Sequence, residues 1–454
     1  MKLVSGTACA ITAMVTACAP KKPVIVDVLP SVTIDRSQSS AIARPIVARS
    51  RNFWEAMSNL EPAFIERHSV SDAQRAFAQA LDMIMSGQPD EAELRLDSLR
   101  AHSSDSLVRA SSRRLLTAML QYQDKWSILA ELNPLRTRDS AATLEKDRAE
   151  VESWADAFKS VSKRSVMFPR RAVVLPLTLS ASGSPMIPVV VNGQNRFFWL
   201  DTGSSMSIIA SDVAAAVGVR PLISDTLEVA TATGRVAAQP AAIARLELGG
   251  IIITSSTAMI VDSGLMEVRL GADGTDKVRI DGIIGFDVIS RLNVAIDYVN
   301  RRVTLSEPQP IPERNRAPRN LFWVGTPIVR MVSANGVALH FNLDTGAQET
   351  YSTDGLITKM RARTFLGERH LVGGLGGLQT VRGRFVNEIR LYLAGQPLLL
   401  RKLLVFAPAY SSFVSLDGIL GSDIGKTGLV RIDATNGVFM IERQKKDDGL
   451  RVEG

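Results

Sequence analysis

The sequence predicts a multidomain protein in which an all-α region is followed by two similar all-β units. Three observations lead to this prediction. The chain has 454 residues, which is too long for one hydrophobic core. Apolar residues recur at helical spacing in its first third, whereas strand and turn patterns dominate from Val173 onward. A two-part motif also occurs twice in the same order, which indicates duplicated structural units.

Each copy of the motif joins an Asp-Thr-Gly turn to a later Asp-Gly-apolar-apolar-Gly segment. The first copy reads LDTGSS at 200–205 and DGIIGFD at 281–287, and the second reads LDTGAQET at 343–350 and DGILGSD at 417–423. The two parts are 80 residues apart in the first copy (281 minus 201) and 73 apart in the second (417 minus 344). The two units therefore have similar lengths, and each presents one aspartate on a tight turn.

The N-terminus resembles a secretory signal peptide over residues 1–17. Its apolar run ends in Val-Thr-Ala-Cys at 15–18, which is similar to the lipobox of bacterial lipoproteins. The resemblance implies acylation of Cys18, and a plain secretory signal with an incidental cysteine is the alternative. Ala19, which is not Asp, favours outer-membrane sorting over inner-membrane retention. We expect a protein of the bacterial cell envelope, anchored by lipid at the periplasmic face of the outer membrane.

Residues 18–50 contain four prolines that interrupt any helix. We expect a lipid-anchored flexible tether here.

Residues 51–165 are predicted to form an α-helical module. In 73–85 the apolar positions step by three and four, and Gly87-Gln88-Pro89-Asp90 is a stop and restart signal. The stretch 78–99 resembles a tetratricopeptide-type helical hairpin, and an ordinary antiparallel bundle is the open alternative. We expect this module to pack or to bind a protein partner, without chemistry of its own.

Each β unit is predicted to use a hairpin to deliver its aspartate. In the first unit, 170–308, the turn Asn192-Gly193 precedes an apolar strand that ends at Asp201. In the second unit, 318–442, Asn335-Gly336 precedes the strand that ends at Asp344. A Pro-rich linker separates the units, and 443–454 is a charged tail.

These motifs resemble those of the retropepsin-like aspartic proteases, the clan of pepsin and the retroviral proteases. LDTGAQET is similar to the acidic loop of the retroviral enzymes, and LVGGLGGL at 371–378 is similar to their glycine-rich flap. The Ser204-Ser205 pair makes the first loop more similar to that of pepsin. The resemblance implies two retropepsin-like lobes that form a pepsin-like pseudo-dimer, with Asp201 and Asp344 as the catalytic acids. Pairing of each lobe with its twin from another molecule is the rival arrangement.

The resemblance also implies supporting roles for the loops. Thr202 and Thr345 are expected to interlock across the lobe interface. The expected support of the two acidic loops comprises Thr202, Gly203, Ser204, Thr345, Gly346 and Ala347. The expected support beneath them comprises Ile284, Gly285, Leu420 and Gly421. The expected substrate flaps comprise Thr231, Thr233, Gly234, Gly373, Gly374, Leu375, Gly376 and Gly377.

Two facing carboxylates cannot both ionise cheaply, so they would share one proton and activate a water for peptide hydrolysis. A hydrogen bond from the Ser204 hydroxyl would leave the charge on Asp201 and the proton on Asp344. Asp281 and Asp417 are predicted to be structural. Glu349 either adds a third carboxylate near the site or lies on the loop surface, and we favour the surface.

Composition limits the other possibilities. The net charge of +7 is spread along the chain, which argues against nucleic-acid binding. The two cysteines lie at positions 9 and 18 and only four histidines are present, so no metal site and no cofactor are expected. The predicted function is an envelope-anchored aspartic endopeptidase, active as a monomer on extended peptides or proteins. The alternative is a non-catalytic, peptide-binding or scaffolding envelope lipoprotein with a protease-like fold.

Overall fold

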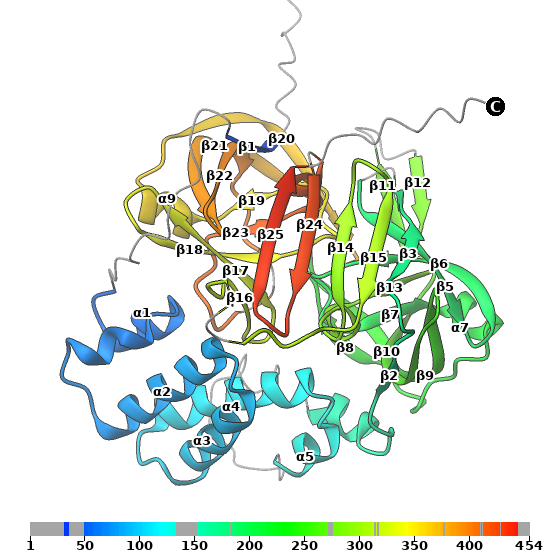
Figure 1. The fold of residues 1–454 in the computed structure, drawn as a ribbon, viewed down its shortest axis with the longest axis horizontal. Coiled ribbons are helices and arrows are strands. Elements are labelled where there is room, and N and C mark those ends of the chain that lie inside the picture. The colour runs from blue at the N-terminus through cyan, green and yellow to red at the C-terminus, as the bar shows by residue number, and fades with distance from the viewer. Residues whose placement is uncertain are drawn as a thin grey trace, which may run out of the picture.

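The fold was analysed in a computed structural model of the chain (Figure 1). The structure describes residues 31–35, 50–132, 152–180, 183–270, 276–312, 315, 317–375, 377–408, 410, 412–426 and 428–443. The predicted signal peptide, the lipidation site Cys18, the flap residue Gly376 and the tail beyond Arg443 lie outside the described residues. None of the helices in the described part of the chain is long and apolar enough to span a membrane.

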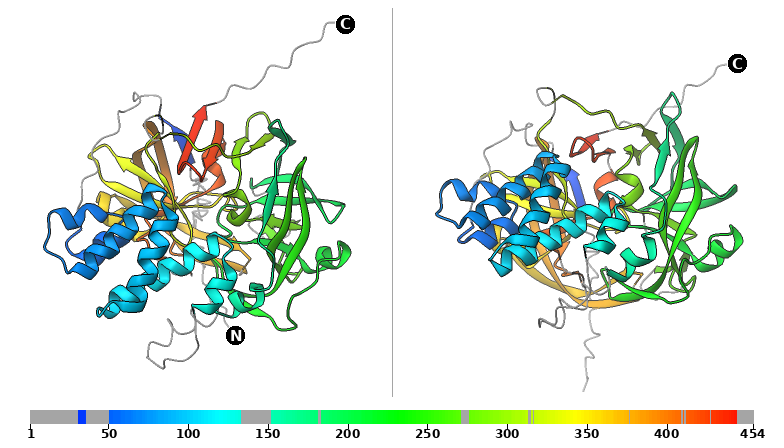
Figure 2. Two further views of the ribbon diagram at one scale, coloured as in Figure 1. Left: turned by 60° about the horizontal axis from the view of Figure 1, so that its bottom comes forward. Right: turned by 90° about the horizontal axis from the view of Figure 1, so that it is seen from below.

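An N-terminal helical region forms as the apolar spacing predicts. Its elements are α1 (Phe53–Ser58), η1 (Pro62–Glu66), α2 (Asp72–Ser86), α3 (Pro89–His102), α4 (Ser106–Tyr122) and α5 (Trp126–Glu131), followed by a helix at 152–158. Ser71 begins α2 with a capping box, and Gly87 ends it in the left-handed conformation that glycine adopts without strain. In Figure 1 this region lies below the β-rich body and runs from the second β unit across to the first, and in the turned views of Figure 2 it lies in front of that body.

The first β unit is built around one nine-stranded sheet. Its elements are β2 (Ser165–Met167), β3 (Val173–Pro176), β4 (Thr178–Leu179), β5 (Pro185–Val191), β6 (Gln194–Leu200), β7 (Ser207–Ala210), α7 (Ser211–Ala216), β8 (Leu227–Ala230), β9 (Arg235–Leu248), β10 (Ile251–Val261), β11 (Glu267–Leu270), β12 (Asp276–Arg279), β13 (Gly282–Ile284), α8 (Phe286–Ile289), β14 (Asn293–Asp297) and β15 (Arg302–Ser306). The predicted hairpin is β5–β6, and β13 pairs in parallel with β6, with Ile284 opposite Leu200.

The second β unit repeats this arrangement. Its elements are β16 (Leu321–Trp323), β17 (Pro327–Ser333), β18 (Ala338–Leu343), β19 (Tyr351–Ser352), α9 (Asp354–Met360), β20 (Thr364–Gly374), β21 (Gly377–Leu393), β22 (Gln396–Leu404), β23 (Gly418–Leu420), η3 (Ser422–Gly425), β24 (Gly428–Asp433) and β25 (Val438–Arg443). Here the hairpin is β17–β18, and β23 pairs in parallel with β18, with Leu420 opposite Leu343. In both units, therefore, the strand before the aspartate lies beside the apolar-apolar-Gly segment.

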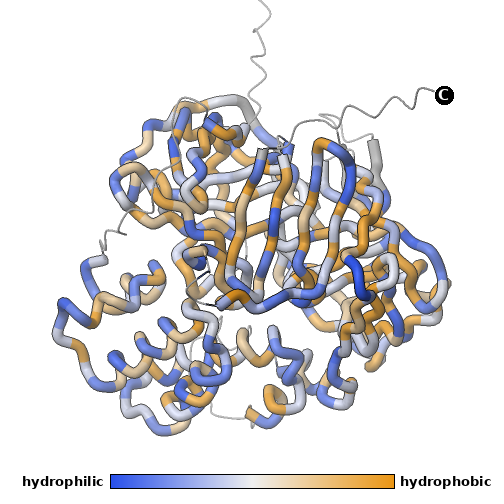
Figure 3. Tube along the Cα trace, viewed as in Figure 1, coloured by the Kyte–Doolittle hydropathy of each residue, from blue (hydrophilic) through white to orange (hydrophobic). Residues whose placement is uncertain are grey.

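A third sheet joins the two units, because its strands come from both. The strand order is β25-β24-β14-β15-β3, and β14 of the first unit pairs antiparallel with β24 of the second, from Asn293 opposite Asp433 to Asp297 opposite Leu429 (Figure 1). Apolar residues alternate with polar ones along many of the strands (Figure 3). The buried apolar side chains of the helices and of both units form one large contiguous cluster.

One short segment of the region predicted to be a flexible tether is a β-strand in the structure. Residues Ser31–Ile34 form strand β1, which extends the sheet of the second unit at the edge of β22. Val32 is buried there, and the Asp35 carboxylate lies 3.0 Å from Arg390. The physical reason is that an open sheet edge offers unpaired backbone groups, which an extended β-branched segment satisfies. The chain is thus docked on the second unit at these residues.

The helical region also packs against both β units through an aromatic stack. The Trp323 ring lies 5.3 Å from Phe286 and 5.1 Å from Tyr122, measured between ring centroids, and its indole N–H donates to the carbonyl of Ala118. These four residues come from β16, α8 and α4, so one side chain connects three parts of the molecule. Buried aromatic side chains dominate the energetics of such interfaces.

Trp323→Ala should therefore lower the free energy of unfolding by about 3 kcal/mol, because it removes the stacked ring and leaves a cavity. Guanidinium denaturation followed by circular dichroism measures this change. Leu94→Ala is the control, since the Leu94 side chain is 75% exposed and its loss should cost less than about 0.5 kcal/mol. Equal effects of the two substitutions would contradict this account of the interface.

Candidate active site

The two Asp-Thr-Gly loops meet through reciprocal hydrogen bonds between their threonines. The backbone N–H of Thr202 donates to Thr345 Oγ1 at 3.1 Å, and the N–H of Thr345 donates to Thr202 Oγ1 at 3.0 Å. Each hydroxyl then donates across the interface, from Thr202 to the carbonyl of Leu343 at 2.9 Å and from Thr345 to that of Leu200 at 2.6 Å. Both threonines are completely buried. Hydrogen bonds are strongest where water cannot compete for the donors and acceptors, so these bonds fix the two loops together.

The interlocked loops bring Asp201 and Asp344 side by side. The N–H groups of Gly203 and Gly346 donate to Asp201 Oδ1 at 2.8 and 3.2 Å, and the N–H of Ala347 donates to Asp344 Oδ1 at 2.9 Å. The two carboxyl groups also share a hydrogen bond. Asp201 thus accepts hydrogen bonds from both loops.

The glycine of each loop lies against the carboxyl group of the other loop. A Cβ added to Gly203 would lie 2.4 Å from Asp344 Cγ, and one added to Gly346 would lie 2.4 Å from Asp201 Cγ. Any side chain at either position would push the acids apart, so this close approach requires glycine.

Burial raises the pKa of both acids. For Asp344, burial is the main cause and the neighbouring charge of Asp201 adds to it, so its pKa lies well above the usual value. Burial also raises the pKa of Asp201, but backbone N–H groups of Gly203, Gly346 and Ser204 stabilise its charged form. The electrostatics therefore place the charge on Asp201 and the proton on Asp344.

The role expected of the Ser204 hydroxyl is wrong. This hydroxyl donates to the carbonyl of Met206 at 2.6 Å and forms no bond to Asp201. The difference between the acids comes instead from backbone N–H groups, because Gly203 and Ser204 of its own turn and Gly346 of the other loop stabilise the charged form of Asp201. A side-chain comparison of Ser204 with Ala347 could not reveal these donors.

The segments beneath the loops hold them by backbone hydrogen bonds. The N–H of Asp201 donates to the carbonyl of Ile284, and the N–H of Asp344 donates to that of Leu420, both at 3.0 Å. A Cβ on Gly285 would lie 2.5 Å from the backbone of Met206. A Cβ on Gly421 would lie 2.4 Å from the carbonyl oxygen of Glu349. Both glycines thus allow the close packing of the acidic loop on its support.

Sequence reasoning missed a second pair of buried aspartates, Asp287 and Asp423. Ser207 Oγ donates to Asp287 at 2.9 Å and accepts the N–H of Gly285, and Thr350 Oγ1 donates to Asp423 at 2.7 Å and accepts the N–H of Gly421. The sequence contains a sign of this pair, because both repeated segments, DGIIGFD and DGILGSD, end in an aspartate. Each of these acids ties the supporting segment of its unit to the residues after its acidic loop.

The two members of this pair differ in their countercharge. Asp287 lies 2.7 Å from the buried guanidinium of Arg164. Asp423 has no such ion pair among the described residues, and burial raises its pKa to about 6. The second unit therefore contains a buried acid that titrates at mildly acidic pH.

The aspartates that open the supporting segments have different surroundings. Asp417 is fully buried, lies 2.9 Å from Lys359 and accepts the N–H of His340 at 2.8 Å. Asp281 is partly exposed and lies 3.9 Å from Arg279. Neither aspartate forms a described hydrogen bond with Asp201 or Asp344.

The two hairpins that contain the predicted flap residues touch at their tips. The first hairpin is β8–β9, whose tip is closed by hydrogen bonds from Thr231 to the carbonyl of Gly234 at 2.7 and 2.9 Å. The second is β20–β21, in which Gly373 pairs with Leu378 and Gly374 with Gly377, next to Leu375. A Cβ on Gly374 would lie 2.9 Å from Thr233 Oγ1, so the two tips are in contact.

Glu349 is buried, and the expectation of a surface position is wrong. Only 7% of Glu349 is exposed, and its Oε2 lies 3.4 Å from Nε2 of His370 on β20. The reason is that β20 of the second hairpin covers this end of the loop, whereas the neighbouring Gln348 stays exposed. A side-chain contact thus links the second acidic loop to strand β20.

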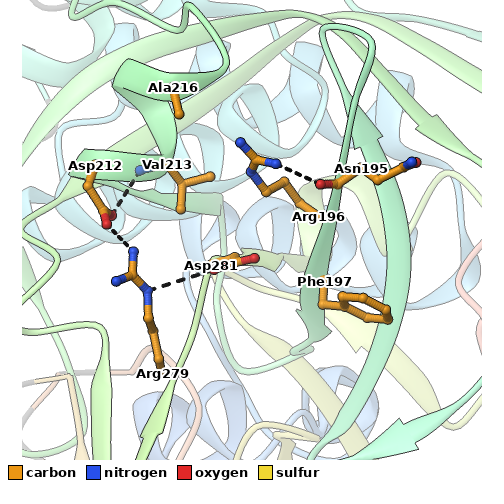
Figure 4. A pocket seen from close by; sticks show the side chains of 8 residues that line it. All are labelled: Asn195, Arg196, Phe197, Asp212, Val213, Ala216, Arg279 and Asp281. Carbon is orange, nitrogen blue, oxygen red and sulfur yellow. Dashed lines mark hydrogen bonds and ion pairs between the residues drawn. The ribbon is translucent and has the colours of Figure 1, made fainter.

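A separate pocket of about 320 Å³ lies on the first unit and contains none of the predicted site residues (Figure 4). Its lining residues are Asn195, Arg196, Phe197, Asp212, Val213, Ala216, Arg279 and Asp281. Arg279 pairs with Asp212, and the two arginines of the lining are balanced by its two aspartates. The pocket therefore has no excess charge to bind an ionic ligand.

Comparison with known proteins finds a partial similarity to aspartic proteases. Residues 187–288 match the family model described as aspartyl protease. One similar solved structure is the aspartic proteinase from Irpex lacteus, with 12% sequence identity, a TM-score of 0.38 and coverage of 62% of this chain and 99% of that chain. No curated protein sequence is significantly similar to this chain. The family match confirms the predicted resemblance to aspartic proteases and falls on the first acidic loop and its support.

The difference between Asp287 and Asp423 predicts a pH effect on stability. The pKa of Asp423 is about 6 in the folded protein against 3.8 ordinarily, so the folded state binds this proton more tightly. Its contribution to stability is complete below about pH 4 and is lost as pH rises to about 6, an effect of roughly 3 kcal/mol. Asp423→Asn should therefore become more stabilising, relative to the wild type, between pH 4 and pH 7.

Urea denaturation at both pH values measures this difference. Asp287→Asn is the matched control: it removes one of the two carboxylates beside the buried Arg164, which keeps Asp124 at 3.3 Å, so its effect on stability should be similar at pH 4 and pH 7. An Asp423→Asn effect that is the same at pH 4 and pH 7 would contradict the assignment.

Proposed function

We propose that the protein is an aspartic endopeptidase, in which a water between Asp201 and Asp344 attacks the peptide bond. The observation that carries this proposal is the acid pair itself: two half-buried carboxyl groups face each other across the interlocked loops, and the glycine of each loop lies against the opposite acid. A purely structural pair of acids would gain nothing from such mutual destabilisation, whereas general acid–base catalysis needs one charged and one protonated partner.

The proposed reaction assigns one role to each acid. Asp201, the charged member, accepts a proton from water as the water oxygen bonds to the carbonyl carbon. Asp344, the protonated member, gives its proton to the carbonyl oxygen, so a neutral tetrahedral diol forms. When the C–N bond breaks, Asp201 returns a proton to the leaving nitrogen and Asp344 recovers one from the diol hydroxyl. Atoms and charges balance, and no further group is needed.

The proposed substrate is an extended peptide segment. What supports this is the pair of hairpins whose tips touch at Thr233 and Gly374, since a strand-like peptide forms backbone hydrogen bonds with such edges. The tips would separate to admit the peptide.

We propose that the active unit is a single chain forming a pseudo-dimer. What supports this is that the reciprocal threonine bonds and the shared β14–β24 pairing both lie within one molecule. A second chain would therefore have to displace contacts that are already made.

We also propose that the protein is anchored in the cell envelope through a lipid on Cys18. The sequence at 15–18 supports this proposal. Only 12 residues separate Cys18 from the docked strand β1 (31 minus 18, minus 1), so the second unit would stay near the membrane surface.

Substitution of either acid tests the activity. Asp201→Asn and Asp344→Asn should each lower kcat by at least about 1,000-fold toward a peptide library at pH 4–7, because each removes one of the two proton-transfer groups. Asp225→Asn, at an exposed position of the same unit, is the control and should retain full activity. A statine-type inhibitor should block the wild type. Cleavage that persists in both acid variants would refute the proposal.

Cys18→Ser tests the anchor. In a bacterial host, the wild type should incorporate a labelled fatty acid and sediment with membranes, and the variant should do neither, because the thiol is the acylated atom. Cys9→Ser, inside the apolar run, is the control. Equal labelling of the wild type and Cys18→Ser would exclude this anchor.

A further inference from the structure

A loop of the second unit connects the helical region to the acid pair. It joins β22 to β23, and its Phe413 ring lies 6.2 Å from the ring of Phe77 on α2. Its Ser415 N–H donates to the carbonyl of Ser58 at 2.8 Å, and the two serine hydroxyls lie 3.1 Å apart. Phe77 is fully buried in the helical region. The helical region therefore fixes this loop by one ring contact and two hydrogen bonds.

The same loop carries Tyr410, whose hydroxyl bonds to the strand that leads to Asp344. Asn342 Nδ2 donates to Tyr410 Oη at 2.7 Å. Asn342 lies near the end of β18, two positions before Asp344, so the Tyr410 hydroxyl is bonded to the segment that delivers the second acid. Burial, and then the charge of Asp344, raise the pKa of Tyr410, so the phenol keeps its proton.

The hydroxyl of Tyr410 has a proton to donate. Its oxygen accepts from Asn342, whose own oxygen accepts from the Thr326 hydroxyl. Within the part of the chain that the structure describes, no hydrogen bond from Tyr410 to an acceptor is found. A phenol bonds as donor and acceptor at once, so the proton is available to a bound molecule.

The first unit lacks this arrangement. The position two residues before Asp201 is Trp199, a buried indole that offers no acceptor for a tyrosine and no amide to orient one. The hydroxyl therefore distinguishes the two sides of the acid pair.

The helical region also contacts the first flap. The indole N–H of Trp154 donates to the carbonyl of Glu228 on β8 at 3.4 Å. Trp154 stacks on Phe158 at 5.6 Å, and both are buried. The helical region thus touches a substrate-side element of each unit (Figure 2).

We propose that Tyr410 is a substrate-binding residue, which donates a hydrogen bond to a backbone carbonyl of the peptide on the Asp344 side. We further propose that Phe413 and Ser415 are positioning residues through which the helical region holds Tyr410 in place. This inference rests on the proposed peptidase function. It makes the helical region part of the substrate site, in place of a separate partner-docking module.

The test uses the full chain and one cleaved peptide. Tyr410→Phe should raise KM about three- to tenfold with little change in kcat, because one neutral hydrogen bond to the substrate is lost. The pH profile of kcat should stay in place, since the acid pair is untouched. Phe413→Ala should produce the same rise in KM, and the more conservative Phe413→Leu a smaller one. Leu94→Ala, on the exposed side of the helical region, should leave KM unchanged.

A double-mutant cycle separates positioning from simple destabilisation. If Phe413 acts through Tyr410, Tyr410→Phe combined with Phe413→Ala should raise KM no more than either change alone. Additive effects would overturn the positioning role, and an unchanged KM or a shifted pH profile in Tyr410→Phe would overturn the substrate-binding role.

Calorimetric binding of a statine-type peptide to the same variants distinguishes the two proposals. A wild type that binds the peptide without cleaving any substrate would refute the peptidase function while the Kd values still test Tyr410. A wild type that neither binds nor cleaves would overturn both.

Discussion

The reciprocal hydrogen bonds between Thr202 and Thr345 are the constraint on which the rest of the site depends. They join two turns from chain segments 143 residues apart and leave no freedom for either aspartate to move away from the other. Two carboxyl groups held so close cannot both be charged. Holding them together therefore destabilises the fold, and many weaker interactions elsewhere offset this destabilisation. The parallel pairs β6–β13 and β18–β23, the close-packed glycines and the shared five-stranded sheet all stabilise the same junction.

The two units are similar in backbone and different in electrostatics. Under the first acidic loop, Asp287 has Arg164 as its countercharge; under the second, Asp423 is buried without an equivalent partner among the described residues and has a pKa of about 6. In the second unit Asn342 binds the hydroxyl of Tyr410, and the corresponding position of the first unit is Trp199. A duplicated scaffold therefore surrounds an asymmetric site, which suits a reaction that needs one base and one acid.

The sequence was most informative where chemistry depends on local pattern. The repeated Asp-Thr-Gly and apolar-apolar-Gly segments predicted the two turns and their supports, because both features are short-range. The sequence did not predict features that depend on contacts with residues far away in the chain. Ser204 bonds to Met206, Glu349 is covered by β20, and residues 31–34 add a strand to β22. In each case a distant segment supplies the partner, and single-sequence periodicity contains no information about that segment.

The most direct test of the shared proton is a titration of the two side chains by carboxyl-carbon NMR in protein labelled at aspartate. The account predicts two steps separated by several pH units, both of which belong to the pair, and a single step for Asp201, with the higher step gone, once Asp344→Asn removes its partner. Two independent titrations near pH 4, with Asp201 unaffected by the loss of Asp344, would contradict the claim that the loops hold these acids around one proton.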